Sequence, residues 1–166
     1  MNLKIIDNDG FLALVDSNKY QPYVKEDWEF DQLISHFISQ SNEGHMIIWK
    51  TGDEGDEWNI RIENEKTAKN SFREFEARIN VTDGQLFLTE YADLTMSASY
   101  PSSKIPSKHN SDLKIHLDNG HYNVIIRQLF NPNLDYSEIK IHFEIIFTKS
   151  EINKIDKPID KIIWFN

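Results

Sequence analysis

The residues best suited to binding or catalysis form an acidic stretch between two tryptophans, Trp49 and Trp58. Ca²⁺ favours carboxylate oxygens, but the spacing of these acids does not fit the D-x-[DN]-x-[DN]-G loop with its closing glutamate. One interpretation is a charged hairpin tip between the strands His45–Lys50 and Glu57–Glu63, which keeps the protein soluble and discourages association of sheet edges. The other is a contact surface for a basic protein, with a tryptophan as an aromatic anchor. The candidate partner-binding residues are Asp53, Glu54, Asp56, Glu57 and Trp58.

Histidines are the second group that could carry chemistry. His116 and His121 flank Asp118, and an alternating strand pattern places the three on one polar face, which would suffice for a weak metal site. His142 could join them if its strand is a neighbour. The ordinary explanation is a solvated strand face, and the chain has no H-x-H pair of the kind that a cupin needs. We keep His116, Asp118 and His121 as a secondary polar cluster and predict neither a metal ligand nor a cofactor.

Enzyme signatures are scarce in this chain. It has no G-x-S-x-G elbow, Walker loop, G-x-G-x-x-G or H-E-x-x-H motif, and no cysteine. Glu74 and Glu76 fall on one face of a predicted strand, and a carboxylate pair is what a glycosidase uses. The polar side of an amphipathic strand explains them more simply. We favour a non-enzymatic protein, leave enzymatic activity open and assign no catalytic residue.

Composition narrows the classes of partner. The chain has 166 residues, with 27 acidic against 18 basic side chains, for a formal charge of −9. Affinity for phosphate comes mainly from Lys and Arg, so nucleic acid and anionic membranes are poor partners and a basic protein is a better one. The absence of cysteine allows a reducing compartment. The first residues lack the features of a signal peptide, and no window reaches the length of a membrane span, so we expect a cytoplasmic protein.

The groups singled out above must be positioned by short alternating strands. The stretch Asp112–Phe130 contains two such runs joined by Asn119-Gly120, the strongest local signal for a hairpin with a type I′ turn. A two-residue loop sets Asp118 opposite His121 and brings the apolar residues of both runs to one side. Asp83-Gly84 predicts a second hairpin by the same reasoning.

Further strands and one helix follow from periodicity. Phe30, Leu33 and Phe37 lie on one face of a helix predicted over Asp27–Ser41, with Asp27 as a candidate cap. The last segment, Ser150–Asn166, is rich in isoleucine and is left open between a short helix and an edge strand. The other stretches predicted as strands are Gly10–Asp16 (apolar on both faces and therefore central), His45–Lys50, Glu57–Glu63, Phe75–Val81, Leu86–Leu88, Ile139–Phe147 and a short, weakly patterned piece within Tyr91–Tyr100.

These elements together predict a mainly β fold. Eight or nine short strands with regularly spaced turns indicate an antiparallel, jelly-roll-like β-sandwich with one amphipathic helix near the N-terminus. No linker composition divides the chain, so we expect a single domain over residues 1–166.

Two segments resemble a known family. Phe75–Leu88 (FEARINVTDGQLFL) and Leu113–Val124 (LKIHLDNGHYNV) are similar to the strand pairs of the competence proteins that inhibit the DNA-entry nuclease of transformable bacteria. The resemblance implies a β-sandwich that binds and blocks a protein. The chain also resembles a second bacterial family, of unassigned function, through its tryptophans, the run Arg73–Glu76 and the motif Y-x-x-L-T-M at Tyr91–Met96.

The leading hypothesis is a non-enzymatic, protein-binding sandwich, an inhibitor or immunity-type protein that neutralises a basic toxin or nuclease. The alternative is a sandwich that binds a small ligand or carbohydrate and could be hydrolytic, which would need a concave site lined by aromatic side chains. A third hypothesis is a homodimer formed through the Ile-rich tail.

Overall fold

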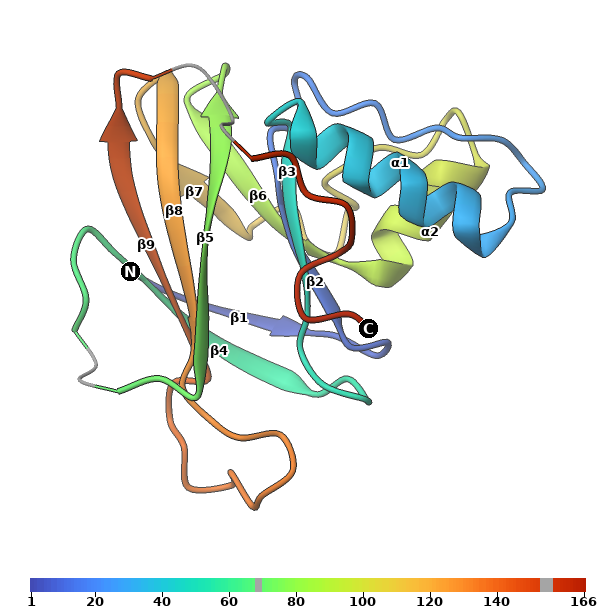
Figure 1. Ribbon diagram of the computed structural model, residues 1–166. Helices are drawn as coiled ribbons and strands as arrows, with labels where there is room; N and C mark the ends of the chain where they lie inside the picture. The colour runs from blue at the N-terminus through green and yellow to red at the C-terminus, as the bar shows by residue number, and fades with distance from the viewer. Residues whose placement is uncertain (68–69, 153–156) are drawn as a thin grey trace.

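The computed structural model describes residues 1–67, 70–152 and 157–166, and it contains two β-sheets packed face to face (Figure 1). The sheets have five strands in the order β1-β4-β9-β8-β5 and four strands in the order β3-β2-β6-β7. The strands are β1 (Asn2–Ile6), β2 (Phe11–Val15), β3 (Met46–Lys50), β4 (Glu57–Glu63), β5 (Arg73–Val81), β6 (Gln85–Glu90), β7 (Lys114–His116), β8 (Gly120–Gln128) and β9 (Phe143–Ser150), and the helices are α1 (Phe30–Asn42) and α2 (Tyr91–Ser99). The predicted mainly β sandwich is confirmed.

Two apolar layers hold the sandwich together. The first lies between the sheets, where alternate residues of each strand, such as Trp58, Ile60 and Val124, are buried. The second lies between the four-stranded sheet and the two helices, which cover its outer face (Figure 1). The central strand β2 contributes to both layers, with Leu12 in the first and Ala13 in the second, which explains its unbroken apolar sequence.

The predicted amphipathic helix is present as α1, shifted by a few residues from its predicted start. Its N-cap is Glu29 rather than Asp27, and the Glu29 backbone N–H donates to the Gln32 side chain at 2.9 Å. Leu33 and Phe37 are buried against the sheet. Neither helix among the described residues has the length and apolar character needed to cross a bilayer.

The hairpins predicted at Asn119-Gly120 and Asp83-Gly84 are wrong, although the alternation of their side chains is right. The strand before Asn119-Gly120 pairs with β6 in one sheet, whereas the strand after it pairs with β5 and β9 in the other. Asp83-Gly84 likewise joins β5 to β6 across the two sheets. Each turn reverses the chain sharply, with positive φ at its glycine, but the chain leaves its sheet there. Local turn chemistry fixes the reversal, whereas the choice of strand partner depends on packing far along the chain.

Three smaller expectations are also wrong. The stretch Tyr91–Ser99 is a helix, because the Glu90 carboxylate caps it by accepting from the backbone N–H groups of Ala92 (2.8 Å) and Asp93 (3.0 Å). The strand predicted from Ile139 begins only at Phe143. The sheets are also not wholly antiparallel, since β4 and β9 run parallel.

The described part of the C-terminal segment is neither a helix nor a full strand. The Lys50 N–H donates to the Ile163 carbonyl at 2.9 Å, a single parallel bridge to the edge of β3. Ile162 is buried, and the Trp164 ring meets Phe75 edge-on at 4.9 Å. Ile155, another apolar residue of this segment, lies outside the described residues. The tail therefore uses much of its apolar surface within its own chain, and the homodimer stays a prediction.

The two turns that cross between the sheets are bonded to each other, which yields a stability test. The Asn119 side chain accepts from the Gly84 N–H at 2.7 Å. We expect Asn119→Ala to lower the free energy of unfolding by about 1 kcal/mol, the usual value of one such bond. Asp118→Ala is the matched control, because the bond recorded for this exposed residue uses its backbone carbonyl. Urea denaturation measures both, and equal stability of the two variants would contradict the role of Asn119.

Candidate functional site

The acidic stretch forms an exposed loop that carries the chain from β3 to β4. These strands lie in different sheets, so the prediction that the stretch is a hairpin tip is wrong. Asp53, Glu54, Asp56 and Glu57 are all exposed. The loop packs closely against the β1–β2 turn, because a Cβ on Gly55 would lie 1.9 Å from the backbone carbonyl oxygen of Asp7. The carboxylates therefore stand on a backbone pressed against the turn between β1 and β2.

The buried carboxylate of Asp7 fixes this arrangement. Only 1% of Asp7 is exposed. Its Oδ1 accepts from the backbone N–H groups of Asp9 (3.1 Å), Gly10 (2.9 Å) and Phe11 (3.2 Å), which shapes the β1–β2 turn. Its Oδ2 accepts from the Thr51 hydroxyl (3.0 Å) and Trp58 Nε1 (3.1 Å) at the two ends of the acidic loop. One carboxylate thus ties the turn and the loop together.

Sequence reasoning missed Asp7. A local signal exists, since an Asp before Asn-Asp-Gly is typical of a side chain that bonds its own turn. The long-range bonds to Thr51 and Trp58 leave no such signal.

Trp58 does not lie on the surface, so the prediction that it anchors a partner there is wrong. It is 1% exposed and stacks on Phe130 with ring centroids 5.0 Å apart. Trp49, on the other side of the loop, is fully buried. Trp58 instead supports the acidic loop from inside through its bond to Asp7.

A second loop, the β8–β9 connection with Asp135, Glu138 and the exposed Lys140, reaches the same end of the molecule (Figure 1). The Tyr136 hydroxyl donates to Asp56 Oδ2 at 2.8 Å and so joins the two loops. Burial and the negative charges of Asp56 and Glu54 raise the pKa of Tyr136 to about 12, so its proton stays on the hydroxyl at neutral pH. Asp135 and Glu138 of this loop are exposed. The acidic surface is therefore larger than the sequence indicated.

Exposed apolar side chains lie among these carboxylates. Ile6 is 63% exposed and Leu134 is 66% exposed. Ile6 lines an open hollow with Asp9 and the acidic loop. A second hollow, between the acidic loop and Tyr136, also includes Phe72. We name this end of the molecule the acidic surface, and it comprises Ile6, Asp9, Asp53, Glu54, Asp56, Glu57, Phe72, Leu134, Asp135, Tyr136 and Glu138.

Several cations lie close to this surface: Lys4 pairs with Glu57 at 2.6 Å, Lys50 donates to the Asp9 carbonyl at 3.1 Å, and Arg73 is held within the chain. Arg73 stacks over the Trp164 ring at 4.1 Å and donates to Gln128 Oε1 at 2.7 Å. It also donates to the carbonyls of Lys50 (3.2 Å) and Thr51 (3.3 Å), which fixes the backbone where the acidic loop begins.

The histidine cluster is not assembled as predicted. His116 lies on β7 and His121 on β8, in different sheets. His121 Nδ1 lies 2.6 Å from Asn80 Oδ1, while His116 and Asp118 line a shallow hollow at the turn. Within the described ranges, no three His, Cys, Asp or Glu residues are grouped so that they could hold a metal ion.

His142 is also apart from that cluster, on the inner side of the acidic surface. It is buried, and its Nδ1 accepts from the Asn59 backbone N–H at 3.0 Å. Burial lowers the pKa of His142, although the charges of Asp56 and Glu57 oppose that shift.

Of the two carboxylates considered as a catalytic pair, Glu74 is engaged in ion pairs. Glu74 binds Arg127 Nε at 2.9 Å, and Arg127 in turn binds the buried Glu144 at 2.5 Å. A hydrogen bond from Lys66 is the main cause that lowers the pKa of Glu74. Glu74 therefore belongs to an ion-pair network on the outer face of the five-stranded sheet.

Comparisons with known proteins find similar folds, but no matching family model or curated sequence. No family model matches the chain, and no curated protein matches it. The fold is similar to that of the protein described as Crocagin biosynthetic gene J, with a TM-score of 0.58, 8% identity and coverage of 88% of this chain and 94% of that chain. It is also similar to ComJ from Bacillus subtilis, described as an inhibitor of the DNA degrading activity of NucA, with a TM-score of 0.53, 10% identity and coverage of 90% of this chain and 96% of that one. The resemblance to the nuclease-inhibitor family is thus confirmed at the level of the fold.

The role of Asp7 can be tested by an isosteric substitution. Asp7→Asn keeps one acceptor oxygen but turns an N–H₂ group towards donors such as Trp58 Nε1, which cannot accept. We expect it to lower the free energy of unfolding by about 2 to 3 kcal/mol, the usual cost of breaking bonds to a buried charged group. Asp9→Asn is the matched control, since the bond recorded to Asp9 from Lys50 uses its backbone carbonyl. Urea denaturation in which both variants match the wild type would contradict the role of Asp7.

The lowered pKa of His142 predicts a pH dependence of stability. In the unfolded chain this histidine titrates near its ordinary value of about 6.5, whereas the folded state holds it neutral to lower pH. Below that value the unfolded state binds more protons, so stability falls as the pH is lowered from 7 to 5. His142→Gln keeps an acceptor for Asn59 but cannot titrate, and we expect its urea midpoint to fall less over this range. An identical fall in both proteins would refute the prediction.

Proposed function

We propose that this protein is a non-enzymatic inhibitor that binds a basic protein through the acidic surface. The observation that carries the proposal is the combination of exposed carboxylates, a rigid backbone beneath them and exposed apolar side chains among them. Asp53, Glu54, Asp56 and Glu57 remain the central contact residues, now with Asp135 and Glu138 beside them. Trp58 supports the loop from below instead of touching the partner.

The charge of the surface is available to a partner. Among the described residues, Glu57 of the acidic loop forms an ion pair with Lys4 at 2.6 Å, and this pair lies at the surface. Asp53 and Glu54 line the hollows with their carboxylates exposed. Clustered charges of one sign attract a basic protein from a distance and disfavour an acidic one.

The rigidity of the loop favours tight binding. A loop that is ordered before binding loses little conformational entropy when the complex forms. The bonds of Asp7 and the close contact at Gly55 provide that order. The exposed Ile6 and Leu134 offer apolar contacts that charge alone would not supply.

The fold comparison supports the inhibitor class. ComJ is described as an inhibitor of a DNA degrading activity, and its similarity to this protein covers 96% of the ComJ chain. By analogy we propose a nuclease or toxin as the target, an immunity-type role, and the cytoplasm as the compartment. The carboxylates of the acidic surface would occupy basic groups that the target otherwise uses, since a nuclease binds its phosphate substrate through Lys and Arg.

One observation favours the alternative of a small ligand. A cavity of about 380 Å³ lies between β3, β5 and the C-terminal segment, and its lining includes Met46, Ile48, Ala77 and Ile163. It is mainly apolar, as ligand sites usually are. The lining has no aromatic side chain among the described residues, which disfavours a carbohydrate.

Reversing charge on the acidic loop tests the proposal. The immobilised protein is incubated with a lysate of the cells that make it, and captured proteins are quantified by mass spectrometry at low and high salt. We expect Asp53→Lys with Glu54→Lys to weaken capture of the partner by at least about tenfold at low salt, because both attractive charges become repulsive. The captured protein, once purified, should lose its own activity when the wild-type protein is added.

The matched control carries the same charge change elsewhere. Glu26→Lys with Asp27→Lys alters two exposed acids before α1, far from the acidic loop in the sequence. This variant should capture the partner as the wild type does. Binding of polylysine to the same proteins measures attraction by charge alone. Equal capture by both variants, or a partner whose activity is unchanged, would contradict the proposal.

A further inference from the structure

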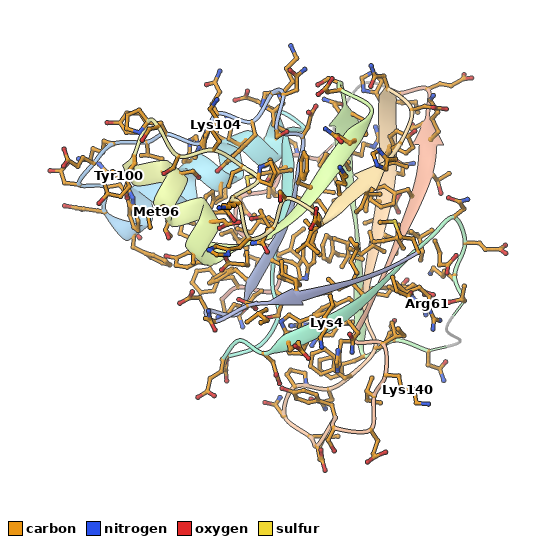
Figure 2. All side chains as sticks on the ribbon, turned by 180° about the vertical axis from the view of Figure 1, so that it is seen from behind. Lys4, Arg61, Met96, Tyr100, Lys104 and Lys140 are labelled. Atoms are coloured by element: carbon orange, nitrogen blue, oxygen red, sulfur yellow. The ribbon has the colours of Figure 1, made fainter. Side chains whose placement is uncertain are left out.

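Strand β1 forms one border of the five-stranded sheet and ends beside the acidic surface. In the described part of the chain it pairs with β4 and with no other strand. Figure 2, seen from behind, shows β1 next to β4 with Lys4 and Arg61 labelled on these strands. Asn2, Lys4 and Ile6 are exposed, whereas Leu3 and Ile5 point into the core.

The hydrogen bonds at the two ends of β1 show which way its backbone groups point. Met1 exchanges bonds with Ile62, donating at 3.1 Å and accepting at 2.8 Å, and the Asp7 N–H donates to the Asp56 carbonyl at 3.0 Å. In an antiparallel pair, residues that bond the partner alternate with residues that face away from it. Odd-numbered residues of β1 therefore bond β4, and the N–H and C=O groups of Asn2, Lys4 and Ile6 point outward. No bond to these outward backbone groups is recorded in the described chain.

Lys4 at the middle of this edge restricts what can pair with it. Two copies of β1 joined antiparallel about their centre would set Lys4 opposite Lys4, and like charges directly opposite are destabilising; each Lys4 also has its own partner, Glu57, at 2.6 Å, which reduces the repulsion. A lysine on an edge strand is a common device against self-association. The edge therefore disfavours a second copy of this chain in that register, while a strand with a neutral or acidic residue opposite Lys4 is accepted.

The geometry points to β1 as the docking edge for an extended strand of the protein partner, an inference that rests on the proposed function. The partner strand adds to the sheet beyond β1 and bonds the outward groups of Asn2, Lys4 and Ile6. Where the strand passes Ile6, Lys or Arg side chains reach the hollow lined by Asp9, Asp53 and Glu54. Backbone bonding supplies affinity, and the charge pattern selects the strand: no cation opposite Lys4 and cations beyond Ile6.

Proline at position 4 tests this docking mode. Proline lacks the N–H that would bond the added strand, yet the Lys4 N–H does not serve β4, so the sheet itself keeps its ladder. We expect Lys4→Pro to weaken binding of the captured, purified partner by at least about tenfold. Lys4→Ala, the matched control, removes the same charge but keeps the N–H and should bind within about threefold of the wild type.

Amide hydrogen exchange, followed by NMR, gives a readout that does not depend on a variant folding. In the free protein, the amides of Leu3 and Ile5 should exchange slowly and those of Lys4 and Ile6 quickly. With the purified partner bound, Lys4 and Ile6 should become protected. If they remain fast in the complex, or if Lys4→Pro binds as well as Lys4→Ala, the strand-docking inference is overturned.

The two proposals fail in different ways. Loss of binding in the Asp53→Lys, Glu54→Lys variant together with unprotected Lys4 and Ile6 leaves the inhibitor proposal standing and removes the docking edge. Failure of the wild-type protein to capture a partner removes both.

Discussion

The carboxylate of Asp7 makes the interactions on which the acidic surface of this molecule depends. It is buried, and each of its oxygens accepts more than one hydrogen bond, which is the condition under which a charge can remain inside a protein. Its partners come from the β1–β2 turn, from Thr51 and from Trp58, so three segments distant in sequence are held at one point. The exposed acids of the neighbouring loop owe their positions to this buried one.

Buried and exposed carboxylates have different roles in this chain. Asp7 and Glu144 lie inside with donors around them and contribute to the architecture. Asp53 and Glu54 stand on the surface, where they cost little to keep charged and remain available to another molecule. Tyr136 links the two β-connections at this end and keeps its proton while it donates to Asp56. A fixed pattern of negative charge around apolar side chains is the result.

Much of the fold could be predicted from alternation, because burial of one strand face is a local property. The buried sides of β4 and β8 and the central position of β2 follow directly from their residues. The pairing of strands could not be predicted. Asn119-Gly120 and Asp83-Gly84 have the residues of hairpin turns, yet at each turn the chain passes into the other sheet. The hydrogen bond between Asn119 and Gly84, which joins the two turns, cannot be predicted from the sequence. The helix at Tyr91 could not be predicted because it is capped by Glu90, and glutamate is not among the preferred N-cap residues.

The candidate site was likewise only partly predictable from the sequence. Its acids were visible as a cluster in the sequence, whereas the exposed position expected for Trp58 was wrong because the indole bonds a carboxylate buried 51 positions earlier. No local sequence signal showed that the β8–β9 connection and Ile6 contribute to the acidic surface, because this surface forms where loops distant in sequence meet at one end of the sandwich.

The most direct test of the account is a map of the bound surface, obtained from backbone NMR shifts of this protein with and without its purified partner. The account predicts changes concentrated in β1, at residues 52–57 and at residues 131–138. Changes centred instead on the exposed Met96 and Tyr100 of the α2 side (Figure 2), with the acidic surface unaffected, would contradict it.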